Sequence, residues 1–404
     1  MMDVEPGRIG LFGLFGTGNM GNDGSLEAMT RFLARVAPDE RPLCICADPG
    51  AVQAALGLEA VPIYGNSSRH RDSLAGRVAG RALLWAHAAR YLRRLRLLIV
   101  PGTGVLDDFS VSPLGWPHDL LSWCLLARLL GVKVALVSIG AGPIHHPLSR
   151  WLMKRAARAA HYRSYRDAVS KSFMESIGFD TRNDPICPDI AFGLKPAEPC
   201  RGRGRPLTVG VGVMTYYGWR DDSSRGGAIY EAYLEKMTGY VAWLLDRGHA
   251  VRILMGDQVD RRAVADLLAS VRACRPRLAD PAMMFEPAHS LHDVMRQMAE
   301  TDLVVVTRYH NLVCALGMGR PAISIGYAAK NDALMEEMGL AGYCQHIERL
   351  DQDLLQSQTM RLIADRAALE TAVRDAGARF HARLQEQEKR LVALLDDGRP
   401  GRES

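Results

Sequence analysis

The chain has 404 residues, a length that suggests roughly two to three domains. Hydrophobic residues make up 48% and charged residues 24%, which is ordinary for a globular protein and excludes wholesale disorder, collagen and a disulfide-stapled miniprotein. The formal net charge of +5 is mild for this length, so it does not by itself indicate a nucleic-acid partner, and we expect none.

The sequence shows no targeting or metal-binding pattern. Its start lacks a basic segment followed by an apolar core and a cleavage site, so we expect no secretory signal. No charge-free apolar stretch reaches about 18 residues, so we expect no transmembrane helix. The eight cysteines form no C-x-x-C pair and no zinc-spaced cluster, which favours reduced thiols and no metal site. A cytoplasmic location is the expectation from these features.

Short apolar strands alternate with helical stretches in the first half of the chain. This alternation predicts βαβ units and a parallel sheet. The expected strands are Arg8–Phe15, Arg41–Ala47, Leu97–Val100 and Val132–Ile139, and a buried helix is expected at Leu120–Leu130.

A second α/β unit follows a linker rich in Pro, Gly and Arg at 194–206. Its expected strands are Leu207–Met214, Ala250–Met255, Leu303–Thr307 and Pro321–Ile325. Its expected helices lie near Tyr230–Arg247 and Arg261–Arg272. A long helical segment from about Leu354 to Leu395 has an apolar face made by Val373, Phe380, Leu384 and Leu391. We therefore predict an N-terminal domain 1–193, a C-terminal domain 207–350, and a helix with a tail at 351–404. Ligands of such folds bind at the carboxyl ends of the strands, so we expect a cleft between the domains.

The first glycine loop, GTGNMGNDG at 16–24, lies between a strand and a helix. Gly18, Asn19, Gly21 and Asn22 are candidates for binding, because glycines let the backbone approach a ligand and a helix N-terminus offers N–H groups to an anion. The alternative is a tight strand-to-helix turn that requires glycine.

Two further glycine loops follow strand ends, PGTGVLDD at 101–108 and IGAGPIHH at 139–146. Their candidate binding residues are Gly102, Gly104, Gly140 and Gly142. Of the adjacent acids Asp107 and Asp108, one could accept a proton from an attacking hydroxyl, or could instead cap the following segment. The histidines that end the third loop are expected at the surface.

The segment YRSYRDAVS at 162–170 contains Arg163 and Arg166. Arginine is suited to bidentate capture of a carboxylate or phosphate. The alternative is an ion pair with Asp167 within a helix.

The most specific segment follows the strand Leu303–Thr307. It reads Arg308-Tyr309-His310-Asn311, and a helix of small apolar residues, a further strand and Lys330 come after it. A cation and an imidazole between a parallel strand and a helix N-terminus can bind an anion and supply a proton. We therefore favour a functional role for His310 over a purely structural one.

A basic stretch at 69–96 carries many arginines together with Trp85 and several leucines. A basic amphipathic helix with tryptophan can rest on an anionic membrane surface, which would place the protein at the inner face of the cell membrane. The alternative is a solvated helix whose apolar face packs in the core.

Five segments together resemble the polysaccharide pyruvyl transferase family. They are GNMGNDGS, PGTGVLDD, VSIGAGP, SYRDAVS with the later PDIAF, and TRYHNLVCALGMGRPAISIGYAAK, in matching order over residues 8–345. Two departures stand out: the second loop reads PGTG where triple glycine is common, and the first reads GNDG in place of the commoner G-N-x-G-D order.

The resemblance implies two Rossmann-like domains in a GT-B-like arrangement. It also implies transfer of the enolpyruvyl group of phosphoenolpyruvate onto two hydroxyls of a sugar, which gives a cyclic ketal and phosphate without a metal or cofactor. It assigns Arg308, Tyr309, His310, Asn311 and Lys330 to the phosphoenolpyruvate side, with His310 as proton donor or phosphate ligand.

The acceptor side would be the N-terminal domain, with Asp108 as base and Arg166 as the family's R-D arginine. The implied acceptor is a glycan of a cell-surface polysaccharide, with or without a lipid carrier. The alternatives are a nucleotide-sugar glycosyltransferase of the same fold and a binding module without catalytic activity. The oligomeric state is left open.

Overall fold

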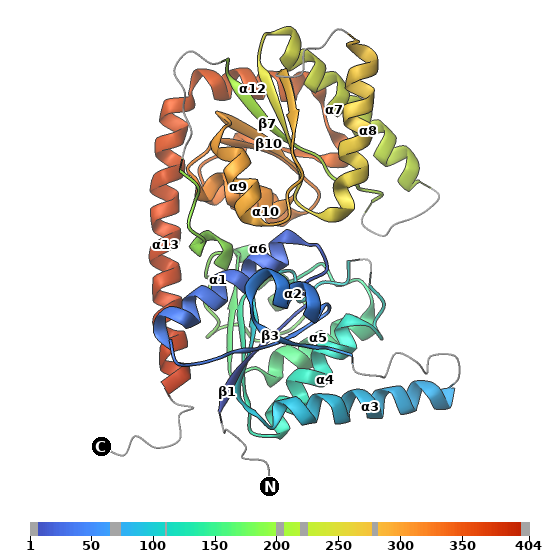
Figure 1. Cartoon of the computed structure of the whole chain (residues 1–404), viewed down its shortest axis with the longest axis vertical. Coiled ribbons are helices and arrows are strands. Elements are labelled where there is room, and N and C mark those ends of the chain that lie inside the picture. Colours follow the sequence, from blue (N-terminus) through green and yellow to red (C-terminus); the bar gives the residue numbers. More distant parts are fainter. Residues whose placement is uncertain are drawn as a thin grey trace. The chain divides into compact units, whose positions relative to one another are not determined.

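The computed structural model describes residues 7–64, 74–109, 111–198, 206–218, 225–276 and 282–396. It consists of two compact units. Unit 1 comprises Met1–Thr17, Ser25–Ile190 and Arg383–Ser404, and unit 2 comprises Gly18–Gly24 and Ala191–Ala382. Each unit is built on its own parallel sheet, which helices cover on both faces (Figure 1).

The sheet of unit 1 has the strand order β3-β2-β1-β4-β5-β6, and all its described pairs are parallel. The central strands are short apolar runs buried on both faces, as parallel strands covered by helices must be. The strands are β1 Arg8–Phe12, β2 Leu43–Cys46, β3 Glu59–Pro62, β4 Leu95–Pro101, β5 Lys133–Ile139 and β6 Tyr162–Tyr165.

The helices of unit 1 lie on two sides of this sheet. Crossovers between parallel strands are right-handed, so the order of the strands places α1 and α2 on one face and α3, α4 and α5 on the other. The helices are α1 Met20–Val36, α2 Pro49–Leu56, α3 Leu74–Leu92, α4 Trp116–Leu129, α5 Pro147–Ala159 and α6 Ala168–Ser176. Helix α4 packs against both α3 and α5.

Unit 2 repeats the design with the strand order β12-β11-β10-β7-β8-β9. Its strands are β7 Thr208–Gly212, β8 Ala250–Leu254, β9 Met283–Phe285, β10 Leu303–Val306, β11 Ala322–Gly326 and β12 Cys344–His346. Its helices are α7 Gly226–Asp246, α8 Arg261–Cys274, α9 Leu291–Ala299, α10 Tyr309–Gly317, α11 Ala329–Glu337, α12 Gln352–Ala364 and the first part of α13 Arg366–Asp396. Short 3₁₀ turns lie at Ile190–Gly193, Gln258–Asp260, Ala341–Tyr343 and Ile347–Arg349.

The predicted α/β class and two-domain architecture are confirmed, whereas the cleft stays a prediction. Two segments depart from the predicted ranges: the loop Gly18–Gly24 belongs to unit 2, and the chain from Arg383 onward belongs to unit 1. The expected C-terminal helix is two helices that meet at Asp365, and the four residues predicted on its apolar face are all buried. Much of the predicted linker, 199–205, lies outside the described residues.

The basic stretch 69–96 is not one helix. Helix α3 ends at Leu92, and Leu95 already belongs to β4. One side of α3 packs into the core through Leu84, Ala88 and Leu92. Across the described residues, no helix combines the length and the apolar character needed to span a membrane.

Candidate functional site

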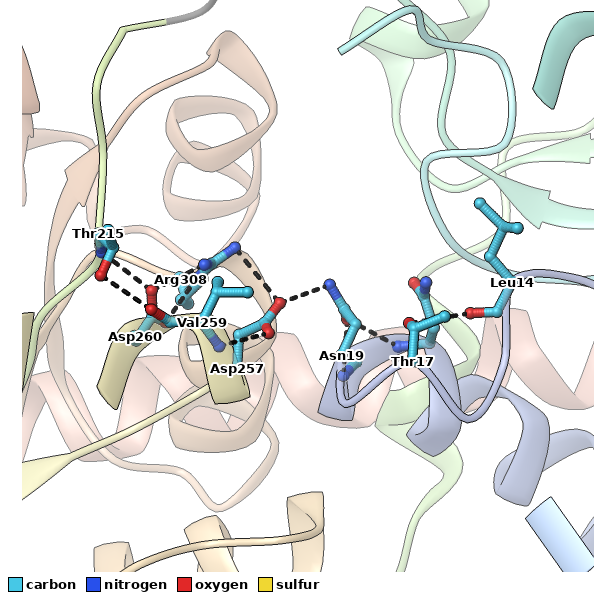
Figure 2. A network of polar contacts seen from close by, with 10 residues as sticks. Leu14, Thr17, Asn19, Thr215, Asp257, Val259, Asp260 and Arg308 are labelled. Atoms are coloured by element: carbon cyan, nitrogen blue, oxygen red, sulfur yellow. Dashed lines mark hydrogen bonds and ion pairs between the residues drawn. The ribbon is translucent and has the colours of Figure 1, made fainter. Parts of the chain in front are cut away.

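An arginine and two aspartates form an ion-paired group at the carboxyl edge of the unit 2 sheet. Arg308 follows β10, and Asp257 and Asp260 follow β8. The guanidinium donates two hydrogen bonds to Asp260, from Nε at 2.8 Å and from Nη2 at 2.7 Å. Its Nη1 lies 3.6 Å from Oδ2 of Asp257, and Figure 2 shows all three side chains. Arg308 is therefore held by two carboxylates of its own unit, one of them through two hydrogen bonds.

Two carboxylates facing one guanidinium leave this group with a formal charge of −1. Burial acts to lower the pKa of Arg308, but the charge and hydrogen bonds of Asp260, and then Asp257, outweigh it and raise that pKa. Burial raises the pKa of Asp257, and the charge of Asp260 adds to this while Arg308 opposes it. A proton on Asp257 would neutralise the group, so Asp257 is a carboxyl suited to holding one.

The first glycine loop is tied to this group. The side-chain Nδ2 of Asn19 donates to Oδ2 of Asp257 at 2.9 Å (Figure 2), and the backbone N–H of Gln258 donates to the Gly18 carbonyl at 3.2 Å. Oδ1 of Asn19 accepts from the backbone N–H groups of Gly21 and Asn22, each at 3.1 Å. We predicted that these N–H groups would be open to an anion, but Asn19 caps the helix and takes them instead.

His310 lies directly against this loop. A Cβ on Gly21 would come within 1.9 Å of His310 Nδ1, so only glycine leaves room for the ring. The ring of Tyr309 lies 5.4 Å from that of His310, at 89° to it. The loop therefore joins the residues predicted for the phosphoenolpyruvate side, and the assignment of Gly18, Asn19, Gly21 and Asn22 to the N-terminal domain is corrected.

Two neighbouring helix N-termini at this edge have no side-chain cap. Helix α10 begins after Arg308 and helix α11 after Ala328, and neither cap residue bonds the first turn through its side chain. Lys330 lies in the first turn of α11, with Nζ 5.0 Å from the centre of the Tyr327 ring and 5.7 Å from that of Tyr309. The positive ends of two helices and a lysine together favour an anion.

Asn311 is fully buried in the first turn of α10. Its side-chain amide lies close to Gly256, where a Cβ would come within 2.4 Å of Oδ1. Neither polar atom of this amide has a hydrogen-bond partner in the described part of the chain. Such a group is costly in a folded protein and calls for a specific reason, such as a catalytic role, a bound ion or an ordered water.

The second and third glycine loops meet in unit 1. The N–H of Gly140 donates to the carbonyl of Thr103 at 2.7 Å, and the N–H of Gly102 donates to the carbonyl of Val137 at 2.7 Å. Thr103 has a backbone φ of 68°, a strained conformation of the kind that clusters at functional sites. Other glycines of these loops are required by their neighbours: a Cβ on Gly140 would come within 2.5 Å of the Arg166 guanidinium.

Gly104 and Gly142 are also constrained from within the unit, by Asp107 and Phe173 respectively. Each added Cβ would approach its neighbour to less than 3.0 Å. The structure therefore gives a packing reason for these glycines, and their role in binding stays a prediction.

Asp108 holds the end of the third loop. Its Oδ2 accepts from the backbone N–H groups of His145 and His146, each at 2.8 Å, while its Oδ1 has no hydrogen-bond partner among the described residues. Both histidines are exposed, as expected, and Nδ1 of His146 caps α5 through the Leu148 N–H. Asp108 thus combines the capping role with one oxygen that could accept a proton.

Arg166 is buried beside two aspartates. It lies at 3.4 Å from Asp167 and 3.6 Å from Asp189. The segment is strand β6 followed by the cap of α6, so the alternative ion pair of Arg166 with Asp167 is present but does not lie within a helix, and Asp167 also caps α6 through the N–H of Ser170. Arg163 instead forms a two-point pair with Asp184.

The structure thus gathers the predicted residues into two groups. Unit 1 holds Asp108, Arg166 and the glycines of the second and third loops, and unit 2 holds the remainder. Sequence reasoning missed Asp257, Asp260 and Asp189. The first two could have been found, because MGDQVD follows the strand AVRILM at the same strand-end position as the other candidate segments.

Solved structures with the same architecture are sugar-modifying enzymes. UDP-GlcNAc 2-epimerase from Neisseria meningitidis bound to UDP-GlcNAc has a TM-score of 0.58 at 9% identity, covering 94% of this chain and 99% of its own. The lipopolysaccharide outer core galactosyltransferase WaaB has a TM-score of 0.53 at 11% identity, with coverages of 94% and 99%. The spinosyn rhamnosyltransferase SpnG has a TM-score of 0.51 at 15% identity, with coverages of 93% and 96%. These likenesses define a GT-B-like two-domain α/β fold.

Within that fold class the sequence decides the family. A profile of the polysaccharide pyruvyl transferase family matches residues 19–328, which is most of the chain. The match spans the loop 18–24 almost from its start and extends past Arg308 and His310 to the end of β11. The protein belongs to the polysaccharide pyruvyl transferase family, and the resemblance seen in the sequence is confirmed.

Proposed function

We propose that this protein transfers the enolpyruvyl group of phosphoenolpyruvate onto two hydroxyls of a glycan, forming a pyruvate ketal and releasing phosphate. The observation that carries the proposal is the family match across the segment Arg308–Asn311, which lies in unit 2 against the glycine loop 18–24. The reaction needs no metal and no cofactor beyond phosphoenolpyruvate, which is the donor substrate.

Phosphoenolpyruvate would bind at the carboxyl edge of the unit 2 sheet. It carries a phosphate and a carboxylate, and the positive N-terminal ends of α10 and α11 together with Lys330 would attract both. Arg308 already donates two of its N–H groups to Asp260, so only the remaining ones on Nη1 and Nη2 could reach phosphoenolpyruvate. We therefore propose that Arg308 mainly positions Asp257 and the loop around it, and that Tyr309 and Asn311 shape the pocket floor.

The chemistry begins with a proton on the methylene carbon of phosphoenolpyruvate. This creates a cationic carbon, which the first sugar hydroxyl attacks while losing its proton to a base. The second hydroxyl then displaces phosphate, which leaves with the remaining proton, and the ketal ring closes. His310 supplies the first proton or binds the phosphate, and Asp257 is a second candidate acid because its pKa is raised.

The acceptor would bind to unit 1. Asp108 has one carboxylate oxygen outside its loop contacts and would take the hydroxyl proton, and Arg166 would organise the second and third glycine loops. The acceptor would be a precursor of a cell-surface polysaccharide. A lipid-linked precursor would place the enzyme in the cytoplasm at the inner face of the membrane, in contact through the stretch 69–96.

A thermal-shift comparison tests the donor. Phosphoenolpyruvate should raise the melting temperature in proportion to the logarithm of its concentration, because it binds the folded state alone. Uridine and guanosine diphosphates should not. His310→Ala should weaken the shift without lowering the melting temperature of the free protein. A shift with a nucleoside diphosphate and none with phosphoenolpyruvate would contradict the proposal.

One observation favours nucleotide-sugar transfer as a second candidate. Unit 2 has a cavity of about 290 Å³ beside the start of α7, with an apolar wall that includes Ile229 and Ile347 and polar groups from Lys236 and Glu348. An apolar wall and a carboxylate that can accept from ribose hydroxyls suit a nucleoside. The thermal-shift experiment separates this candidate from the first.

A further inference from the structure

The charge of the chain is concentrated in one stretch of unit 1. Residues 73–166 contain fourteen lysines and arginines but only three acids, Asp107, Asp108 and Asp119, so this stretch has a formal charge of +11 against +5 for the whole chain. The rest of the chain is therefore net acidic. Asp119 is buried and accepts from the Tyr64 hydroxyl, Asp108 accepts from backbone N–H groups, and neither forms a salt bridge with an arginine of the described helices.

This stretch builds the layer α3–α4–α5, which covers one face of the unit 1 sheet (Figure 1). Its exposed arginines form no salt bridge with any acid in the described part of the chain. They are Arg90, Arg93, Arg94, Arg128, Arg150, Arg155 and Arg158. On the opposite face of the sheet, exposed charges are paired, as in Arg31 with Glu27 and Arg35 with Glu388.

The same layer exposes apolar side chains among its arginines. Of eleven large apolar side chains that are exposed in the described residues, five lie on these three helices: Leu83, Trp85, Leu129, Leu148 and Trp151. Trp85 on α3 is 37% exposed and Trp151 on α5 is 52% exposed, with the Arg155 guanidinium 5.4 Å above the ring of Trp151. Such surface hydrophobics are ordinary when scattered, but a concentration on one layer marks an interaction surface.

Helix α4 adds an apolar stripe between the two basic helices. Leu121, Leu125 and Leu129 are four residues apart, so they lie on one face of the helix. Leu121 is half-buried and packs against the core, Leu125 is half-buried, and Leu129 is 67% exposed, so this face reaches the surface toward the end of the helix. A leucine stripe flanked by arginines and tryptophans has the composition of a surface that lies in the headgroup region of a bilayer.

We propose that the outer face of the α3–α4–α5 layer docks on the anionic surface of a lipid bilayer. Trp85, Leu129 and Trp151 enter the boundary between headgroups and acyl chains, and the arginines pair with anionic headgroups while their stems lie along apolar surface. This surface is wider than the stretch 69–96 and includes α4 and α5. This proposal rests on the proposed function in one respect: docking would bring the enzyme to a lipid-linked acceptor.

The test is sedimentation of the full-length protein with vesicles. Vesicles of phosphatidylcholine mixed equally with phosphatidylglycerol should bind the protein, vesicles of phosphatidylcholine alone should not, and high salt should release it. Replacing Arg90, Arg93 and Arg155 by Gln should weaken binding on the order of 100-fold, because each basic residue near an anionic surface contributes roughly fivefold. Trp85→Ser with Trp151→Ser should weaken binding even at low salt.

A matched control removes the same charge from unit 2. The variant with Arg261, Arg272 and Arg349 replaced by Gln should bind vesicles as the wild type does, because these exposed arginines lie outside the layer. An equal loss in this control would overturn the proposal, as would equal binding to neutral vesicles. The proposal would also be overturned if the protein formed a dimer in solution that dissociates in the Trp85/Trp151 variant. It would be overturned as well if the protein bound an anionic polysaccharide more tightly than vesicles, in a salt-dependent way.

Phosphate release with a water-soluble acceptor is measured in parallel without vesicles. The layer variants should keep this activity. Vesicle binding without acceptor-dependent phosphate release would refute the proposed reaction alone, and phosphate release without vesicle binding would refute the docking surface alone.

Discussion

Replacing Gly21 by Ala should displace the His310 imidazole. The new Cβ would lie 1.9 Å from Nδ1 and 2.3 Å from Cγ of His310. Because non-bonded carbons pack at about 3.5–4.0 Å, the ring must move by more than about 1 Å. A shift of about 1 Å at a catalytic group can reduce turnover on the order of 100-fold. Overpacking costs about 1–3 kcal/mol of stability, and alanine in a helix returns about 1 kcal/mol of that, so the fold should survive.

The assay is the rate of phosphate release from phosphoenolpyruvate in the presence of a glycan acceptor, with a thermal melt of each variant. Gly24→Ala is the matched control, because its Cβ would meet Leu291 at 2.3 Å in the same loop without touching His310. The control should lose stability but keep its turnover. Unchanged turnover in Gly21→Ala, or an equal loss in both variants, would refute the role given to His310.

Three further changes probe the buried charges and hydrogen bonds. The folded-state pKa of Asp257 is raised above 3.8, so the stability that its proton contributes is present below that pH and is lost as the pH rises through the folded pKa. Asp257→Asn should therefore weaken the pH dependence of stability and leave the melting temperature at neutral pH unchanged or higher. A marked drop of the melting temperature at neutral pH would contradict a raised pKa of Asp257. Arg166→Leu leaves the buried Asp189 without its cation and should lower the free energy of unfolding by about 3–5 kcal/mol in urea, whereas Arg166→Lys should lose much less. Gln387→Ala removes the hydrogen bond from the Ser164 hydroxyl and the one to the Ser138 hydroxyl, and should cost about 1–3 kcal/mol; a loss below about 0.5 kcal/mol would show that these bonds are not stabilising.

The centres of both sheets were predictable from sequence, and the edges were not. The eight strands we predicted are the four central strands of each sheet, whose continuous apolar runs follow from burial on both faces. The four missed strands are the edges, with the sequences EAVP, YRSY, MMF and CQH. They are three or four residues long and partly exposed, so neither a long apolar run nor an alternating pattern marks them.

Some residues of the candidate site were predictable from the sequence, but the contacts between them were not. Strand-end position identified Arg308 and His310, because the carboxyl ends of parallel strands share one edge. It could not show that Asn19 bonds Asp257, since these residues are 238 positions apart in the chain and belong to one compact unit that is discontinuous in sequence. It also could not show that the charge of Arg308 is already matched by Asp260, because ion pairs depend on the register between strands.

Acceptor-dependent release of phosphate from phosphoenolpyruvate tests the central claim most directly. With a panel of cell-surface glycan precursors, at least one acceptor should release phosphate in proportion to the acceptor consumed, and mass spectrometry should find that acceptor converted to a cyclic pyruvate ketal. Phosphate release that never depends on an acceptor, or sugar transfer from a nucleotide sugar under the same conditions, would contradict the account.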